Sequence, residues 1–293
     1  MVRVPEQDDE RESRRATFDR VAEQYDAARP TYPDALLDDL VELARIPAGG
    51  RILEIGPGTG KASVALAERG FDLVGVELGE ELAAVARRRL GSFPAARIVV
   101  ADFEQWEPEL AEFDAIVAFT SFHWIAPELR YTKTARLLRP GGALVVVDPE
   151  HVLLPGADRE LWAGVEAIIN DVVPHPDSGP PPAPEDVGDL REEIEASGLF
   201  DEVIVRRHLW SVDYTADEYV ALLGTYSLML LPPERERHEI CSRVHALIAE
   251  HGGLITQTNL GVLNVAEVSR SSQSRPITGN ERLTDRVSRR QSR

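Results

Sequence analysis

The stretch Arg51-Ile-Leu-Glu-Ile-Gly-Pro-Gly-Thr-Gly60 decides the fold, because a short apolar strand runs directly into a glycine-rich turn. The residues that follow, 61–69, have helical character and end at Gly70, a residue that suits the end of a helix. Glycines allow a tight bend and a close approach of the backbone to a ligand. A strand, a glycine turn and a helix in this order predict a ligand-binding element of an α/β fold.

Alternation of apolar strands and helices continues on both sides of this element. We expect strands at 51–55, 72–77, 97–101, 113–119 and 143–148, and helices at 61–69, 80–90 and 131–138. Strands that are apolar throughout indicate a parallel sheet covered by helices on both faces. Right-handed crossovers then predict a doubly wound, Rossmann-like α/β fold.

The remainder of the chain predicts additions to this core. Helical patterns occupy 17–43, 159–172, 189–196 and 234–250. A capping box at Thr215-Ala-Asp-Glu218 predicts the start of a further helix. Two further strands, at 202–210 and 254–265, bring the expected sheet to seven strands, mostly parallel. We expect one domain over 17–268, with N-terminal helices at 17–45, a cofactor-binding core at 46–148 and a helical substrate roof over the active site at 149–200 and 211–252. The polar ends, 1–16 and 269–293, are expected to be disordered.

Composition narrows the classes of function. The formal net charge of −18 disfavours a binder of nucleic-acid backbones, although the tail at 269–293 is basic. No apolar run approaches the roughly 20 residues that cross a bilayer, and no secretory signal is visible, so we expect a cytoplasmic protein with no membrane partner. The single cysteine, Cys241, excludes an internal disulfide and a cysteine-cluster zinc site, and no metal ligands are predicted.

Two classes of ligand are considered for the glycine turn, a dinucleotide and a ligand with a cationic ammonium group, and the neighbouring residues fit the second better. A dinucleotide site has the pattern G-x-G-x-x-G, which would place a third glycine at position 61, where this chain has Lys61. Glu54, two positions before the first glycine, is a poor neighbour for a pyrophosphate and a good one for a cationic ammonium group. Both differences count against a dinucleotide, and an NAD-dependent oxidoreductase is kept as the alternative enzyme.

The run Glu54-x-Gly56-x-Gly58-x-Gly60 resembles the first motif of class I S-adenosylmethionine-dependent methyltransferases. Further stretches match the same family: Glu77 at the end of the second strand, Asp102-Phe103 after the third, Phe113-Asp114-Ala-Ile-Val117 in the fourth and Leu138-Arg-Pro-Gly-Gly142 before the fifth. The resemblance implies that S-adenosylmethionine is the cofactor. It also implies that Glu77 holds the ribose hydroxyls and that Asp102 and the backbone of Phe103 hold the adenine.

Other motifs resemble a narrower subgroup, the small-molecule (type 11) methyltransferases around trans-aconitate methyltransferase. These motifs are Phe18-Asp-x-x-Ala-x-x-Tyr25-Asp, Arg29-Pro-x-Tyr-Pro33, Ser121-Phe-His-Trp124 and Gly224-Thr-Tyr-Ser227. This resemblance adds Tyr25, Arg29 and Phe119 to the cofactor site. Trp124, Trp162 and Trp210 are candidate walls of the substrate pocket.

The expected reaction is methyl transfer to a small-molecule acceptor, with a carboxylate or hydroxyl oxygen favoured. A carboxylate needs no base, whereas a hydroxyl, amine or carbon acceptor would use one, and His123 is the candidate catalytic residue. Simpler interpretations stay open: Glu77 as a helix-start acid, Asp102 as a cap and His123 as a local packing residue. A non-catalytic cofactor-binding protein of the same fold is the alternative outside enzymes, and a monomer or homodimer is expected.

Overall fold

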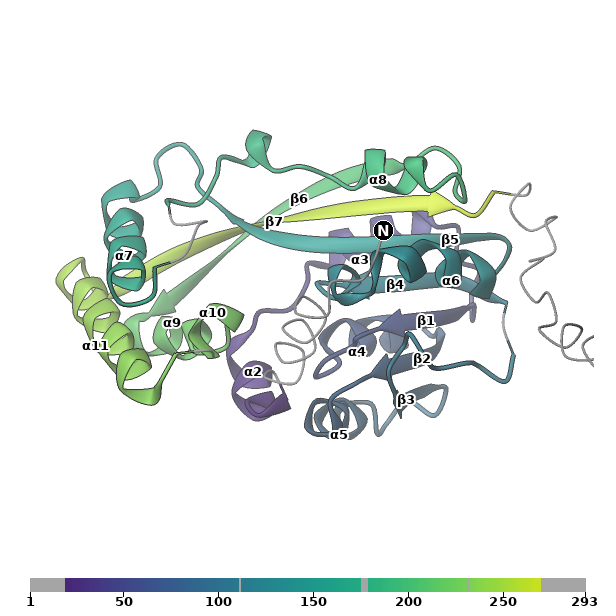
Figure 1. Ribbon diagram of the computed structural model, residues 1–293, viewed down its shortest axis with the longest axis horizontal. Helices are drawn as coiled ribbons and strands as arrows, with labels where there is room; N and C mark the ends of the chain where they lie inside the picture. The colour runs from purple at the N-terminus through teal and green to yellow at the C-terminus, as the bar shows by residue number, and fades with distance from the viewer. Residues whose placement is uncertain (1–18, 111, 175–178, 231, 270–293) are drawn as a thin grey trace, which may run out of the picture.

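A computed structural model of the chain describes residues 19–110, 112–174, 179–230 and 232–269 (Figure 1). Its centre is one seven-stranded sheet in the order β3-β2-β1-β4-β5-β7-β6. The strands are β1 Arg51–Ile55, β2 Asp72–Glu77, β3 Ala96–Val100, β4 Phe113–Phe119, β5 Leu138–Val152, β6 Ile204–Thr215 and β7 Leu254–Glu267. The first five pair in parallel, and β7 runs antiparallel to both β5 and β6. The predicted mostly parallel, Rossmann-like α/β sheet is confirmed.

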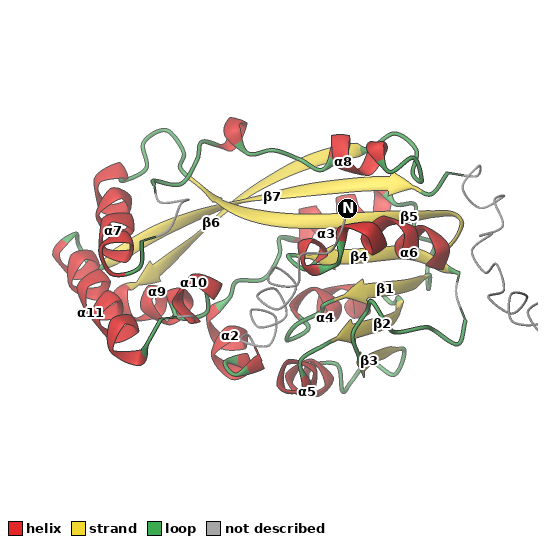
Figure 2. Cartoon of the chain, in the orientation of Figure 1, coloured by secondary structure: helices red, strands yellow, loops and turns green. Residues whose placement is uncertain are grey.

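Helices cover both faces of this sheet (Figure 2). They are α2 Ala22–Ala28, α3 Asp34–Leu43, α4 Lys61–Glu68, α5 Glu80–Arg89, α6 Pro127–Leu137, α7 Arg159–Val172, α8 Arg191–Ala196, α9 Ala216–Leu223, α10 Ser227–Leu230 and α11 Glu234–Glu250. On one face Leu36 of α3 and Leu66 of α4 pack against alternate residues of β1, β4 and β5. On the other face Tyr131 of α6 and Ile194 of α8 join the opposite set. Among the described residues, no helix is both long and apolar enough to traverse a membrane.

Three strands run well past the edge at which β1 and β4 stop. Phe119, the last residue of β4, pairs with Val147, whereas β5 continues to Val152 and pairs there only with β7. The projecting ends of β6 and β7 carry a further apolar cluster, in which Tyr214 and Ile255 pack with α7, α9 and α11. The bundle of helices therefore lies beyond the carboxyl edge of the parallel strands (Figure 1).

The roof differs in two ways from the expected helical segment. Its walls include strand as well as helix, because β5 runs on to Val152 and β6 to Thr215. Helix α8 lies elsewhere, beside α6, where Arg130 donates to Glu193 over 3.0 Å. The capping box at Thr215 and Glu218 is confirmed, with both reciprocal hydrogen bonds present. The expected disordered ends, 1–16 and all of 269–293 except Ser269, lie outside the described residues.

Candidate active site

The glycine turn between β1 and α4 lies at the carboxyl edge of the sheet. Gly56, Gly58 and Gly60 all have positive φ angles, of 63°, 59° and 81°, which side chains other than glycine rarely adopt. A Cβ on Gly56 would lie 2.7 Å from Cβ of Ser121, so this position also needs the missing side chain for space. A Cβ on Gly58 would meet no atom within 4 Å. The turn thus presents bare backbone to the space above it.

Two cavities meet at this turn. The larger, of about 480 Å³, extends from Glu54 and the turn toward the projecting strands and α7. The smaller, of about 280 Å³, extends along the ends of β2 and β4. Both are lined by Tyr25, Arg29, Gly56, Gly58, Phe119, Thr120 and Tyr226. One elongated molecule lying across the turn would therefore contact both cavities.

Glu54 supplies a carboxylate to the floor of the larger cavity. Its side chain is 1% exposed, and Oε2 accepts a hydrogen bond from Oγ of Ser63 over 2.5 Å. Burial raises the pKa of Glu54 to about 7, the Ser63 hydrogen bond opposes that rise, and the charge of Glu77 adds to it. A cationic ligand group beside this carboxylate would stabilise its ionised form, so the site favours a ligand that carries a positive charge.

Glu77 ends β2 and lines the smaller cavity. Its Oε2 accepts from the amide of Gly58 over 2.8 Å, and its Oε1 accepts from the amide of Gly79 over 3.0 Å. Burial raises the pKa of this carboxyl, and the two backbone hydrogen bonds oppose the rise. Glu77 therefore ties the glycine turn to the start of α5 while its carboxylate stays at the cavity wall.

Arg29 is held at the junction of the two cavities. Its Nε donates to Oγ1 of Thr225 over 2.8 Å, and Nη2 donates to the carbonyl of the same residue over 3.1 Å. The guanidinium lies 4.2 Å from the ring centre of Tyr226 and 5.1 Å from that of Tyr25. Within the described residues no carboxylate pairs with Arg29, so its positive charge is available to an anionic group of a ligand.

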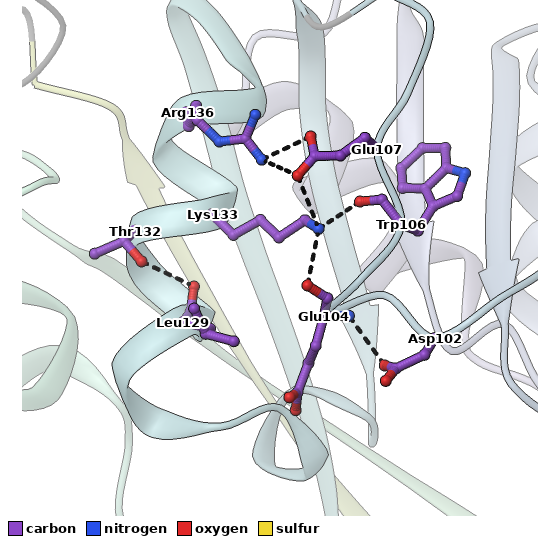
Figure 3. A network of polar contacts seen from close by, with 8 residues as sticks. All are labelled: Asp102, Glu104, Trp106, Glu107, Leu129, Thr132, Lys133 and Arg136. Atoms are coloured by element: carbon purple, nitrogen blue, oxygen red, sulfur yellow. Dashed lines mark hydrogen bonds and ion pairs between the residues drawn. The ribbon is translucent and has the colours of Figure 1, made fainter. Parts of the chain in front are cut away.

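The segment after β3 is fixed by a polar network on α6 (Figure 3). Nζ of Lys133 donates to the carbonyls of Glu104 and Trp106, and Arg136 donates to both carboxylate oxygens of Glu107 over 2.7 and 2.8 Å. This network positions Phe103, which is 3% exposed and lines the smaller cavity.

Asp102 lies in the same segment but does not line either cavity. Its Oδ1 accepts from the amide of Glu104 over 3.0 Å, and its Oδ2 accepts from Gln105 over 3.2 Å. In this arrangement the carboxylate caps its own turn, which is the simpler of the two sequence-based interpretations. Gly60 likewise lines neither cavity; it precedes α4 and packs beside Ala86.

His123 and Trp124 follow β4 in a short 3₁₀ turn and line only the smaller cavity. Their rings lie 4.8 Å apart. Partial burial lowers the pKa of His123, and the charge of Arg130 acts in the same direction. The structure does not bring His123 to the larger cavity, and its catalytic role stays a prediction.

The expectation for Trp162 is corrected. This side chain is 2% exposed and belongs to the core of the helical bundle, not to the wall of either cavity. Its ring centre lies 4.1 Å from that of His151 and 5.6 Å from that of Tyr219, and both of those residues line the larger cavity. Trp162 therefore supports the wall from behind, whereas Trp210 lines the larger cavity.

Several lining residues were not singled out in the sequence. Tyr226 lies within a quoted subgroup motif, so that motif pointed to it. His151 on β5 and Gln257 and Asn259 on β7 had no such motif. Their one local indication is polarity at alternate positions of a buried strand: Gln257 is 4% and Asn259 6% exposed.

Comparison with known proteins identifies the class. The family model described as a methyltransferase domain matches residues 52–142, which span β1 to the start of β5 and include the glycine turn, Glu77 and Phe103. Together with the seven-stranded sheet, this match identifies residues 52–142 as an S-adenosylmethionine-dependent methyltransferase domain. S-adenosylmethionine is its cofactor, so the oxidoreductase alternative is set aside.

Individual relatives agree with this class. An uncharacterized methyltransferase of Mycobacterium tuberculosis is 28% identical over 246 residues, which cover 84% of this chain and 91% of the relative. Trans-aconitate 2-methyltransferase of an Acidovorax species is 36% identical over 126 residues, 41% of this chain and 47% of that protein. A solved structure from Anaeromyxobacter dehalogenans, assigned as a type II methyltransferase, covers 82% of this chain and is itself covered to 97%, with a TM-score of 0.58 and 23% identity. This last likeness shows the fold.

Proposed function

We propose that this methyltransferase transfers the methyl group of S-adenosylmethionine to an oxygen atom of a small acceptor bound in the larger cavity. The observation that carries the proposal is the meeting of two cavities at one glycine turn. A methyltransferase needs one space for the cofactor and an adjoining space for the acceptor. A relative named for methylation of trans-aconitate supports an acceptor of small size.

The smaller cavity fits the nucleoside part of the cofactor. Glu77 presents carboxylate oxygens that can accept from ribose hydroxyls, in addition to the two backbone amides that they already bind. Apolar walls from Leu78, Ala101, Phe103 and Ile125 suit a flat purine ring. Asp102 would reach the adenine amino group only after turning from its own cap, so in this proposal the backbone beside Phe103 is the more direct partner.

The junction of the cavities fits the amino-acid part. Glu54 can bind a cationic amino group, and Arg29, which no described carboxylate neutralises, can bind a carboxylate. Gly58 leaves open space between them. Tyr25 and Phe119 border the same junction. Opposite charges on the two sides of one turn match the zwitterion of an amino acid.

S-adenosylmethionine supplies an electrophilic methyl group on a sulfonium, so the protein has no need to activate the donor. The residues of this chain instead hold the acceptor in line, at roughly 3–3.5 Å, and exclude water. The helices α7, α9 and α10 and the projecting strands enclose that space (Figure 1). A carboxylate acceptor requires nothing further; a hydroxyl acceptor requires a base, for which His123 is the sequence-based candidate.

Calorimetry tests the cofactor assignment before an acceptor is known. We expect S-adenosylhomocysteine to bind the wild-type protein and NAD not to bind. Glu77→Ala should weaken that binding, whereas the matched control Asp72→Ala, at the other and exposed end of β2, should leave it unchanged. Equal affinities of wild type and Glu77→Ala would contradict the assigned role. Transfer of a labelled methyl group to a library of small carboxylates and alcohols then tests the acceptor class.

A further inference from the structure

Three polar side chains form a row across the projecting strands. His151 of β5 is paired with Asn259 of β7, and Asn259 is paired on its other side with Trp210 of β6. Residues paired directly across neighbouring strands place their side chains on the same face of the sheet. All three line the larger cavity. The row therefore forms one continuous strip of its wall.

Each member of the row has one buried nitrogen atom without a hydrogen-bond partner among the described residues: Nε2 of His151, Nδ2 of Asn259 and Nε1 of Trp210. Buried polar groups in proteins are almost always hydrogen-bonded, because an unpaired one loses its water contacts without replacement. Three such atoms side by side on one cavity wall point to a ligand that pairs with them.

Neighbouring contacts fix the orientation of two of the groups. Oδ1 of Asn259 accepts from Nε2 of Gln257 over 2.9 Å, which leaves the amide nitrogen Nδ2 as the free end. The indole of Trp210 lies over Gly261, where a Cβ would come within 3.0 Å of Cζ3. The glycine at that position makes room for the ring and limits its movement.

Asn264 on the same strand provides a contrast. Its Oδ1 accepts from the amide of Leu190 over 3.0 Å, and its Nδ2 lies within 3.4 Å of the carbonyl oxygens of Val146 and Val262. Asn264, a buried asparagine of β7 that lines neither of the two cavities, thus has partners for both its oxygen and its nitrogen. The unpaired nitrogen of Asn259 is specific to the cavity wall.

The chemistry of the row defines its ligand. The indole Nε1 and the amide Nδ2 only donate hydrogen bonds, and a neutral imidazole donates or accepts according to its tautomer. Burial lowers the pKa of His151 to about 4, so the ring is neutral near pH 7. No member of the row is charged. The rest of the cavity wall includes the apolar and aromatic residues Ile169, Tyr219, Leu222 and Met229, together with the carboxylates of Glu150 and Glu166.

We propose that His151, Asn259 and Trp210 are the specificity site for the methyl acceptor, and that they bind an uncharged carbonyl oxygen on an otherwise apolar molecule. The inference rests on the proposed function, because it takes the larger cavity as the acceptor site. His151 lies four residues beyond Val147, where β4 ends, or about 13 Å along the strand at about 3.3 Å per residue. The row therefore holds the end of the acceptor remote from the methylated oxygen.

Nuclear magnetic resonance on the protein saturated with S-adenosylhomocysteine tests this proposal. Tryptophan is labelled with ¹⁵N, the indole signal of Trp210 is assigned with Trp210→Phe, and acetophenone, benzoate and toluene are titrated as probes. We expect acetophenone to shift that signal and to bind at least fivefold more tightly than toluene or benzoate. Trp210→Phe and Asn259→Leu should each weaken acetophenone binding at least threefold, and the control Trp106→Phe, outside both cavities, should not.

Affinity for S-adenosylhomocysteine separates the possible failures. Each variant must keep the wild-type affinity, which shows that it is folded and that the cofactor site is intact. If the wild-type protein does not bind S-adenosylhomocysteine, the proposed function fails. If it does bind, the row proposal is overturned by absent acetophenone binding, by tighter binding of benzoate, or by equal acetophenone binding in wild type and variants.

Discussion

Glu54→Gln should remove a pH dependence from the stability of the cofactor-free protein. Burial raises the pKa of Glu54 from 4.5 to about 7 in the folded state. The folded protein therefore holds this proton more tightly than the unfolded chain does. The stability that this tighter proton binding contributes is fully present below pH 4.5 and is lost as the pH rises through about 7. Glutamine is uncharged at every pH, so the variant lacks this loss.

The magnitude follows from the two pKa values. The interval between 4.5 and about 7 corresponds to about 3 kcal/mol, at about 1.4 kcal/mol per pH unit. Between pH 5 and pH 8, most of this amount is lost, or about 2.5 kcal/mol, as an order of magnitude. The side chain is 1% exposed, so solvent screening reduces the effect little.

Urea denaturation of wild type and Glu54→Gln at pH 5, 6, 7 and 8 measures the effect. Glu77, Asp148 and Glu150 also have pKa values raised by burial, and they add the same trend to both proteins. The quantity of interest is therefore the difference in unfolding free energy between the two, which should move by about 2–3 kcal/mol in favour of the variant as the pH rises. Glu68→Gln, an exposed position on α4, is the matched control. Parallel curves for wild type and Glu54→Gln would refute the reasoning.

Three further predictions concern single side chains. Glu77→Ala should weaken S-adenosylhomocysteine binding by roughly 1–3 kcal/mol in calorimetry, the order expected for loss of charge-assisted hydrogen bonds, with circular dichroism unchanged. Asn264→Leu should lower the unfolding free energy by about 2 kcal/mol, because it removes the hydrogen-bond partner of the Leu190 amide and three hydrogen bonds in all, whereas Asn259→Leu, which removes only the partner of the Gln257 side chain, should cost less. His123→Ala should raise KM for S-adenosylmethionine and leave the pH profile of kcat in place, since His123 lines only the smaller cavity; a flattened profile would instead support the base.

Local patterns predicted the core of the fold well. The strand, turn and helix around Gly56 and the capping box at Thr215 depend on neighbours a few residues apart, and the structure has both. Strand ends were predicted less well: β5 was expected to end at Asp148, but pairing with β7 carries it to Val152. That pairing joins residues far apart in the sequence, so no local pattern could indicate it.

The residues of the candidate site likewise fall into those that a local motif indicates and those that only strand pairing brings together. Glu54, Gly56, Gly58 and Glu77 belong to one continuous motif and its next strand, and they line the two cavities. The row of His151, Asn259 and Trp210 exists only through the register of three strands. The sequence could not align these positions. It could also not show that Trp162 lies one layer behind the wall, since a buried tryptophan and a pocket tryptophan have the same helical spacing.

In the projecting strands β5, β6 and β7, main-chain pairing holds the fold, whereas the cavity-facing side chains shape the larger cavity. Their main chains are held by pairing along strands of 15, 12 and 14 residues, while side chains of the projecting parts alternate between the cavity and the opposite face. If the larger cavity binds the acceptor, as proposed, a substitution at a cavity-lining position of these strands changes the acceptor site and leaves the hydrogen-bonded frame as it was. The glycine turn and Glu77, at the far end of the same cleft, are untouched by such changes. Under the proposed function, the acceptor preference can therefore change through these positions while the cofactor site stays as it is.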